Sequence, residues 1–175
     1  MSQRDSGYER KERDLYETPE WVTRALLPHL PPGIKEIWEP ACGSGLMVNA
    51  LEMGGYLVHA TDIVKGHDFL DAQPGDGIDV GHDAIITNPP YKDAQAFIEL
   101  ALKRAGLVAM LLRTDYDHAK TRAHLFAGCS AFAKKIVLTK RIKWFEDSKG
   151  SPSFNHAWFV WNMKHSGPPT LAYGP

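Results

Sequence analysis

The segment at residues 85–91 reads Ile-Ile-Thr-Asn-Pro-Pro-Tyr, a run of buried-strand residues that ends in an amide, two prolines and an aromatic ring. Two consecutive prolines stiffen the backbone and lack N–H donors, so their carbonyl groups can only accept hydrogen bonds. The Asn88 amide oxygen, the Pro89 carbonyl and the face of Tyr91 can therefore converge on one spot. Such a spot fits a planar group that bears an –NH2. The alternative interpretation is a proline pair that simply ends the strand.

A second candidate segment, Glu-Pro-Ala-Cys-Gly-Ser-Gly at residues 39–45, lies between a predicted strand and a predicted helix. Its glycines allow a tight turn and a close approach of the backbone to a ligand, and the following helix offers free N–H groups. Val48 stands where a dinucleotide-binding turn has its third glycine, and the Gly-Lys-Ser/Thr of a phosphate loop is absent. Glu39 would repel a phosphate and favours a cationic ligand. An ordinary tight turn is the alternative.

Asp62 follows the next predicted strand, 17 residues beyond Gly45. In sheets that bind nucleosides, an acidic residue about 20 residues beyond the glycine turn accepts hydrogen bonds from ribose hydroxyls. We therefore expect Asp62 to bind a ribose, and an exposed loop aspartate is the alternative.

Hydrophobic periodicity and turn residues predict the elements that carry these segments. We expect a helix from Thr18, with Thr18 as N-cap and Pro19 in the first helical position, to the stop at residues 31–33. Further helices are expected over residues 46–53, 93–104 (with Gly106 as C-cap) and 118–126, and strands over 34–38, 56–63, 84–87, 107–112, 133–142 and 156–161. This alternation predicts an α/β fold with a mostly parallel sheet and helices on both faces. The last two strands lack a helix between them, which predicts an antiparallel hairpin with a loop from about Trp144 to Asn155.

The composition indicates one globular domain. The 175 residues are 43% hydrophobic with a net charge of −1, and this length can bury a single sizeable core. The apolar runs fall far short of the roughly 20 residues that cross a bilayer, and no apolar leader opens the chain. Two cysteines cannot build a disulfide scaffold or a four-ligand zinc site. We expect a cytoplasmic protein with no membrane contact and no metal site, in which residues 1–14 form a mobile arm, 15–165 the domain and 166–175 a C-terminal tail.

These segments together resemble the class I S-adenosylmethionine-dependent methyltransferases, in particular the amino-methylating branch that includes DNA adenine-N6 methyltransferases. Residues 88–91, Asn-Pro-Pro-Tyr, are similar to the catalytic motif of that branch, and residues 39–45 are similar to its cofactor loop. Residues 16–19, Tyr-Glu-Thr-Pro, resemble the segment that closes over the methionine end of the cofactor. The resemblance spans roughly residues 15–165 and implies a Rossmann-like sheet.

The resemblance implies that the chain uses S-adenosylmethionine and releases S-adenosylhomocysteine. It places Thr18 and Pro19 at the methionine moiety, Glu39 near the cationic end, and Asp62 at the ribose. Asp68 and Phe69 resemble the pair that binds the cofactor adenine. Only five residues separate Asp62 from Asp68, where the family has a helix and a strand, so we expect the fold to be abbreviated between its second and fourth strands. The implied cofactor-binding set is Thr18, Pro19, Glu39, Ala41, Gly43, Gly45, Asp62, Asp68 and Phe69.

The activity implied by the resemblance is methyl transfer from S-adenosylmethionine to the exocyclic N6 amine of adenine in DNA. Its catalytic residues would be Asn88, Pro89, Pro90 and Tyr91. The motif is shared by enzymes that act on RNA adenine, DNA cytosine N4 or protein glutamine, and these substrates stay open. A catalytically idle methyltransferase-like module that binds nucleic acid is an alternative from another class.

Charge is distributed unevenly along the chain, which favours nucleic acid as the partner, and the resemblance implies that this nucleic acid is DNA. Residues 1–100 carry 17 Asp and Glu against 8 Lys and Arg, whereas residues 101–175 carry 4 against 12. Basic side chains interleaved with aromatic rings suit backbone neutralisation and base stacking, although a solvated basic face is the alternative. His156 is expected to be a hydrogen-bonded structural residue, with substrate orientation as the alternative. The candidate nucleic-acid-binding residues are Arg113, Lys120, Arg122, Lys140, Lys143, Trp144, Lys149 and Phe154.

Overall fold

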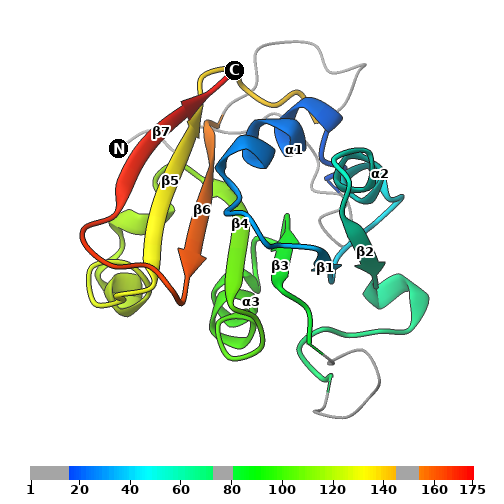
Figure 1. Ribbon diagram of the computed structural model, residues 1–175, viewed down its shortest axis with the longest axis horizontal. Helices are drawn as coiled ribbons and strands as arrows, with labels where there is room; N and C mark the ends of the chain where they lie inside the picture. The colour runs from blue at the N-terminus through cyan, green and yellow to red at the C-terminus, as the bar shows by residue number, and fades with distance from the viewer. Residues whose placement is uncertain (1–15, 73–80, 145–153) are drawn as a thin grey trace.

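A computed structural model of the chain describes residues 16–72, 81–144 and 154–175. Within these ranges a seven-stranded sheet crosses the molecule in the order β2-β1-β3-β4-β6-β5-β7 (Figure 1). β2, β1, β3 and β4 are parallel neighbours, β6 is antiparallel to both β4 and β5, and β7 is parallel to β5. The strands are β1 Glu36–Glu39, β2 Leu57–Ala60, β3 Ala84–Thr87, β4 Leu107–Arg113, β5 Phe132–Leu138, β6 His156–Asn162 and β7 Thr170–Gly174.

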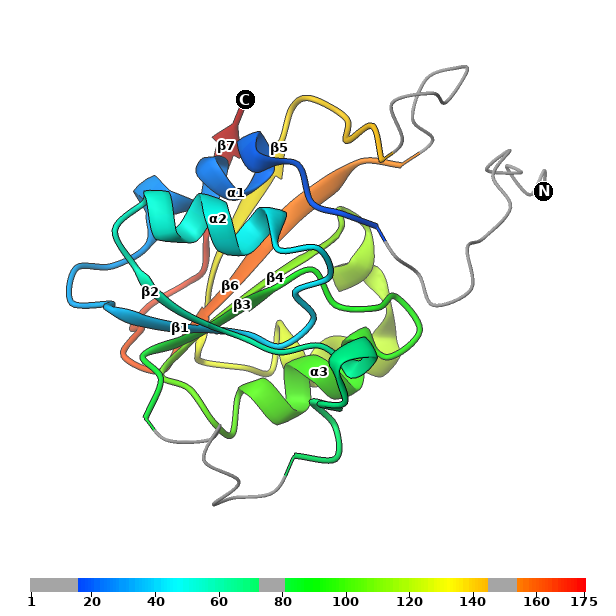
Figure 2. The ribbon, with the colours of Figure 1, turned by 90° about the vertical axis from the view of Figure 1, so that its right-hand side faces the viewer.

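Helices cover both faces of this sheet, as predicted. Figure 2 shows α1 (Glu20–Leu26) and α2 (Leu46–Met53) on one face and α3 (Ala94–Ala101) on the other. Short 3₁₀ helices complete the described elements, namely η1 Leu27–His29, η2 Ile63–Lys65, η3 Tyr116–His118 and η4 Lys120–Leu125. The α/β class, the mostly parallel sheet and the antiparallel β5–β6 hairpin are therefore confirmed.

The core lies on both sides of the central strands, which explains their composition. Every residue of β3 is buried, and so are residues 107–112 of β4, because helices shield a parallel sheet on both faces. One apolar cluster packs under α1 and α2, and the other packs under α3 and η4. Trp158 and Trp161 are fully buried, and their indole N–H groups donate to the carbonyls of Val22 (2.8 Å) and Leu125 (2.6 Å).

The fold is shortened between β2 and β3, as predicted. In the described part of that segment, residues 61–72 and 81–83, the one regular element is η2. β2 is consequently an outer strand of the sheet, and its neighbour on the inner side is β1.

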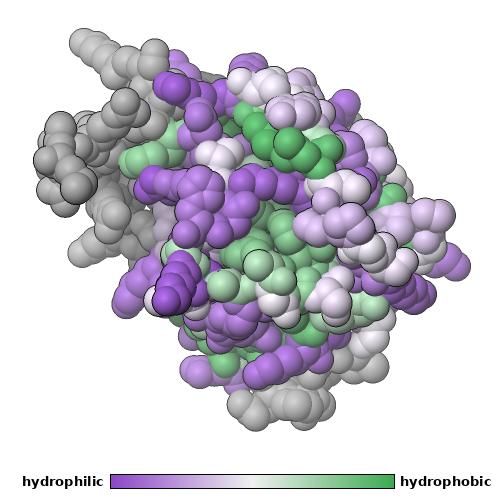
Figure 3. Space-filling view, turned by 90° about the vertical axis from the view of Figure 1, so that its left-hand side faces the viewer, coloured by the Kyte–Doolittle hydropathy of each residue, from purple (hydrophilic) through white to green (hydrophobic). Residues whose placement is uncertain are grey.

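The C-terminal end differs from the prediction of a tail from residue 166. Residues 170–174 form β7, which pairs along its length with β5. β7 is an outer strand with exposed and half-exposed residues, so its sequence lacks the alternation of buried and exposed residues that predicts a strand. Backbone pairing with β5 holds it in place. Seen from the side of β7, the molecule presents a hydrophobic area bordered by hydrophilic residues (Figure 3).

Local boundaries also differ. The stretch 118–126, predicted as one helix, contains the last residue of η3 and all of η4, because Ala119 between these elements has an extended backbone (φ −82°, ψ 128°). Pro19 is the N-cap of α1 and not its first helical residue. Leu102 caps α3, so Gly106 does not have that role. Among the described residues, none of the helices has the length and apolar character needed to cross a membrane.

Candidate cofactor pocket and active site

A pocket opens at the carboxyl ends of β1, β2 and β3. The chain runs from β1 to β2 on one side of the sheet and then returns to β3 on the other side of β1. Open α/β sheets bind ligands at such a reversal of strand order, outside the carboxyl ends of the strands. The lining residues are Tyr16, Glu17, Thr18, Glu39, Ala41, Cys42, Gly43, Ser44, Leu46, Met47, Asp62, Ile63, Val64, Asn88 and Pro90.

The glycine loop after β1 turns tightly at one wall of the pocket. Gly43 (φ 50°) and Gly45 (φ 96°) have left-handed backbone conformations, which side chains with a Cβ rarely adopt. The Gly45 N–H donates to the Cys42 carbonyl (2.8 Å), and Gly45 caps α2. Among the described residues, apart from each glycine and its two chain neighbours, no atom lies within 4 Å of the place where a Cβ would stand on either glycine. The backbone is therefore open to close approach by a ligand.

Asp62 ties the loop after β1 to the loop after β2. Its Oδ2 accepts a hydrogen bond from the Gly43 N–H, and its Oδ1 accepts one from the Val64 N–H, both at 2.8 Å. The residue is 5% exposed and lines the pocket. A carboxylate oxygen has a further lone pair after one such bond. The same side chain can therefore hold the loop and accept a hydroxyl group.

Glu39, at the end of β1, is a buried acid at the bottom of the pocket. It is 1% exposed, and its Oε1 accepts hydrogen bonds from the Thr87 hydroxyl (2.5 Å) and the Ala41 N–H (3.0 Å). Burial raises the pKa of this carboxyl to about 8, against the lowering effect of the two hydrogen bonds. The group is consequently protonated at neutral pH, and a positive charge in the pocket would favour its ionised form.

Asn88 presents an acceptor to the pocket. Its Nδ2 donates to the main-chain carbonyl of Tyr16 (3.1 Å), which orients the amide. Its Oδ1 is buried and has no hydrogen-bond partner among the described residues. A buried polar atom without a partner costs about 1–3 kcal/mol, and such atoms are few in folded proteins. This oxygen is therefore available to accept a hydrogen bond from a donor group of a ligand.

Aromatic rings gather beside Asn88. The Tyr16 ring lies 5.6 Å from that of Tyr91 and 5.4 Å from that of Trp144, measured between centroids. The Tyr91 hydroxyl lies 2.9 Å from His156 Nε2. These rings come from the segment before α1, the loop after β3, the loop after β5, and β6. A planar group next to Asn88 would meet aromatic surfaces.

The structure brings together most of the predicted cofactor and catalytic residues. Thr18, Glu39, Ala41, Gly43, Asp62, Asn88 and Pro90 line the pocket. Pro19, Gly45, Pro89 and Tyr91 lie next to lining residues in the chain but are not in the lining themselves.

The predicted adenine-binding pair lies elsewhere. Phe69 is 2% exposed and packs in the core, with its ring centroid 5.0 Å from that of Trp38 and 4.8 Å from that of Phe97. Asp68 is half-buried, and its Oδ1 accepts a hydrogen bond from the Leu70 N–H (2.9 Å). The short link from Asp62 places Phe69 among the apolar residues under α3, where burial of the ring is favourable. Neither residue is part of the pocket lining.

Several lining residues were missed, foremost the apolar pair after Asp62. Ile63 and Val64 are 63% and 54% exposed, and exposed neighbouring apolar side chains beside a pocket suit the face of a flat ligand. Their position directly after an acidic strand end was the signal available in the sequence. The other missed residues are Tyr16, Glu17, Cys42, Ser44, Leu46 and Met47.

The predicted nucleic-acid residues form two groups. Arg113 and Phe154 lie near the candidate active site: the Arg113 guanidinium is 4.0 Å from the Phe154 ring centroid and forms an ion pair with Asp115 (2.7 Å). Arg113 also pairs across the sheet with His156. Trp144 joins this group through its contact with Tyr16.

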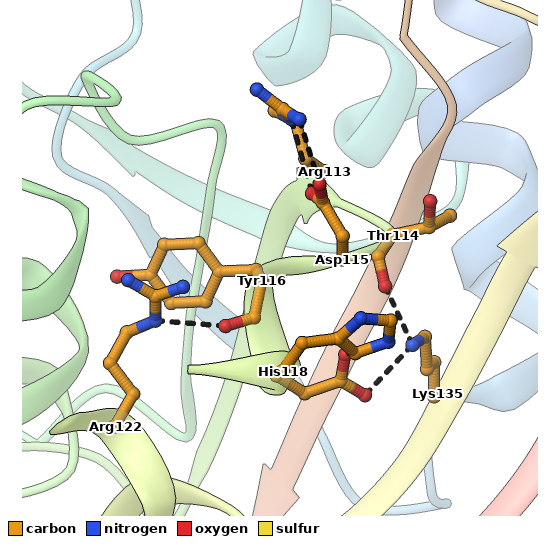
Figure 4. A network of polar contacts seen from close by, with 8 residues as sticks. Arg113, Thr114, Asp115, Tyr116, His118, Arg122 and Lys135 are labelled. Atoms are coloured by element: carbon orange, nitrogen blue, oxygen red, sulfur yellow. Dashed lines mark hydrogen bonds and ion pairs between the residues drawn. The ribbon is translucent and has the colours of Figure 1, made fainter. Parts of the chain in front are cut away.

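The remaining cations lie further along the same edge. Arg122 donates to the Tyr116 carbonyl (2.8 Å) and stacks on its ring, while Lys135 bridges Thr114 and Asp117 (Figure 4). Lys140 lies over the Trp21 ring at 5.1 Å, and Lys120 and Lys143 are exposed. Lys149 lies outside the described residues.

Comparison with known proteins shows a shared fold. The sequence matches no family model, and no curated protein is a significant match. Among solved structures, the chain is similar to a modification subunit of a putative type I restriction enzyme from Vibrio vulnificus YJ016 (15% identity, TM-score 0.61, 90% of this chain and 46% of that one). It is also similar to a type I restriction-modification methyltransferase subunit from Streptococcus thermophilus (15%, 0.55, 86% and 45%).

A putative RNA methyltransferase from Pyrococcus horikoshii has the same fold (10% identity, TM-score 0.54, 81% of this chain and 80% of that one). The chain spans less than half the length of the two restriction-system subunits. The α/β architecture is thus the Rossmann-like sheet that these similar structures share, as predicted.

Proposed function

We propose that this chain transfers a methyl group from S-adenosylmethionine to the exocyclic amine of a nucleobase, with N6 of adenine in DNA as the substrate. The observation that carries the proposal is the buried Oδ1 of Asn88 in the pocket lining, which has no hydrogen-bond partner within residues 16–72, 81–144 and 154–175. An acceptor held in this way suits an amine hydrogen.

The pocket residues fit the cofactor. The open backbone at Gly43 and Gly45, the carboxylate of Asp62 and the exposed pair Ile63–Val64 offer close approach, hydroxyl binding and an apolar surface for a nucleoside. Glu39 supplies an acidic group for the cationic end. When bound, the cofactor supplies a methyl group on a positively charged sulfonium.

Residues of the loop after β3 would act on the amine. The lone pair of an exocyclic amine is delocalised into the ring, so the amine is a poor nucleophile. Hydrogen bonds from it to Asn88 Oδ1 and the Pro89 carbonyl favour a pyramidal nitrogen with more lone-pair density, and Tyr91 would stack on the base. Positioning and charge stabilisation then supply most of the catalysis.

A nucleic-acid substrate is supported by the surroundings of the site. Three aromatic rings lie beside Asn88, and a base offers a π-face to each of them. Basic residues follow along the same edge of the sheet. Two of the similar structures are subunits of type I restriction systems and a third is a putative RNA methyltransferase, so the experiment must include both DNA and RNA.

The test is transfer of labelled methyl groups from S-adenosylmethionine to duplex DNA, single-stranded DNA, RNA and protein, each digested so that the modified unit is identified by mass. We expect N6-methyladenine in DNA. Asn88→Ala should remove the activity, while Asn49→Ala, an exposed asparagine of α2 outside the pocket, serves as the matched control. Label in RNA or protein would overturn the substrate and keep the chemistry, whereas no label with any polymer would overturn the proposal.

A further inference from the structure

His156 is a buried polar residue at the start of β6 that contacts the active-site loop. It is 2% exposed, and its Nε2 lies 2.9 Å from the Tyr91 hydroxyl. The two residues are 65 positions apart in the chain, and the hydrogen bond joins the loop after β3 to the antiparallel strand two places along the sheet. The Tyr91 ring is thereby attached at its far end as well as at its backbone.

The imidazole is itself held in place. Its ring lies nearly parallel to that of Tyr91 (interplanar angle 24°, centroids 6.3 Å apart), and the Trp144 ring meets it edge-on at 5.2 Å. The pairing of β6 with β4 fixes its backbone opposite Arg113. A residue confined by a strand, an aromatic edge and a hydrogen bond has little rotational freedom.

The imidazole is neutral at ordinary pH. Burial, aided by the nearby Arg113 guanidinium, lowers the pKa of His156 to about 4. In one tautomer of the neutral ring, Nε2 accepts a hydrogen bond from the Tyr91 hydroxyl, and in the other its N–H donates a hydrogen bond to the hydroxyl oxygen. Either tautomer gives one hydrogen bond without placing a buried charge beside the substrate.

We propose that His156 is a positioning residue for methyl transfer: through the Tyr91 hydroxyl it fixes the angle of the Tyr91 ring, so that the ring meets the substrate base next to Asn88. The inference rests on the proposed function and adds to it a residue that acts through another and does not touch the reacting atoms. Loss of this hydrogen bond should change one binding property and not the other. Neither His156 nor Tyr91 lines the cofactor pocket, so the bond should affect the nucleic-acid substrate and leave cofactor affinity alone.

The experiment compares Tyr91→Phe, His156→Phe and the double variant with the wild-type chain. Each single variant removes the same hydrogen bond and keeps a ring. We expect each to raise the KM for the nucleic-acid substrate about fivefold to tenfold, the range that one hydrogen bond of about 1–1.4 kcal/mol gives. The double variant should be no worse than either single one, because the same bond is lost once. His156→Gln, which keeps a polar nitrogen or oxygen in reach, should restore the KM to within about twofold of the wild type.

Controls separate this role from a purely structural one. The affinity for S-adenosylhomocysteine, measured by calorimetry, should stay within about twofold in every variant, and His124→Phe, at an exposed position on η4, should change neither quantity. In ¹⁵N spectra the Nε2 signal of His156 should shift in Tyr91→Phe. If His156→Phe does not fold, the KM values of Tyr91→Phe and His156→Gln for the nucleic-acid substrate still test the positioning role of His156.

Three outcomes overturn the inference. An unchanged KM in Tyr91→Phe, additive losses in the double variant, or an Nε2 signal indifferent to Tyr91→Phe would each show that His156 only supports the fold. A wild-type chain that methylates no polymer would remove the proposed function and this inference with it. A wild-type chain that methylates normally, beside variants that match it, would remove this inference alone.

Discussion

Hydrogen bonds between buried carboxyl groups and the main chain hold the side of the site that we propose for the cofactor (the cofactor side). Ring and cation contacts at partly exposed side chains hold the side that we propose for the substrate (the substrate side). Asp62 and Glu39 together accept bonds from three main-chain N–H groups. Across Asn88, Tyr16 and Trp144 meet ring to ring, and Arg113 covers Phe154. On the proposed function, the first side would bind an invariable small molecule and could be rigid. The second would have to admit a polymer, to which exposed side chains can adapt. The two sides meet at Asn88.

Replacement at that meeting point should have the largest effect. Asn88→Ala removes the acceptor for the amine, and we expect transfer to fall about 100-fold or more, by analogy with the loss of one preorganised polar group in an active site. Cofactor affinity should stay within a few-fold. Initial rates and calorimetry with S-adenosylhomocysteine measure the two effects, and near-normal turnover would contradict the assigned role.

Replacement on the cofactor side should cost stability as well as binding. Asp62→Ala leaves the N–H groups of Gly43 and Val64 without their acceptor, and we expect a loss of about 2–4 kcal/mol in unfolding free energy together with weaker cofactor binding. Denaturant unfolding and calorimetry are the measurements. Asp68→Ala is the matched control, since Asp68 lies outside the pocket lining. An equal loss of cofactor affinity in both variants would contradict this description of the pocket.

The buried acid of the cofactor side should make binding depend on pH. Because the carboxyl of Glu39 has a pKa of about 8, it is protonated below that pH and ionised above it. Binding of the cationic S-adenosylmethionine should therefore strengthen as pH rises from 7 to 9, while the less positively charged S-adenosylhomocysteine should show less change. Calorimetry at several pH values measures the ratio of the affinity for S-adenosylmethionine to the affinity for S-adenosylhomocysteine. Glu39→Gln should remove the pH dependence of this ratio. A ratio constant with pH in the wild type would contradict the prediction.

The same shift has a signed effect on stability. Without cofactor, the folded chain keeps a proton on Glu39 that the unfolded chain releases above the ordinary pKa of 4.5. The contribution of Glu39 to the free energy of unfolding should therefore decline as pH rises from about 4.5 to 8. His156 acts oppositely. Its pKa is lowered from 6.5 to about 4, so its contribution is present above 6.5 and declines as pH falls toward 4. Unfolding of Glu39→Gln and His156→Gln across this range separates the two.

Replacement of exposed cations on the substrate side should have the smallest effect. Lys143→Ala and Lys140→Ala should each raise the KM for nucleic acid a few-fold at low salt and reduce the salt dependence of binding, because each lysine neutralises at most about one phosphate. Binding titrations at several salt concentrations measure this slope. Lys35→Ala, close to β1 at the opposite end of the sheet, is the control, and an equal slope change there would contradict a localised interface.

Prediction of the fold and the candidate site from the sequence was most accurate at buried strands and glycine turns, where few residue types fit. The Ala84–Thr87 strand and the loop at 39–45 follow from local patterns that tolerate few alternatives. The shortening after Asp62 was predicted from its short spacing to Asp68, compared with the family that the sequence resembles. Phe69 could not be placed in this way, since packing against Trp38 and Phe97 depends on elements distant in the chain. The β7 strand was missed because pairing with β5, and not a hydrophobic pattern, determines it. The contact of Tyr91 with His156 requires the sheet order, which the sequence does not state.

The bond that orients Asn88 has a consequence for sequence variation. Its acceptor is the main-chain carbonyl of Tyr16, and every amino-acid type carries that atom. A saturation library at position 16 should consequently change the ring contacts with Tyr91 and Trp144 while retaining the orientation of the amide. Removal of residues 16–18 would eliminate both together. The orientation of Asn88 should thus tolerate substitution at position 16 but not deletion, whereas the ring contacts should be lost in both, and a mutational scan of this segment can distinguish the two effects.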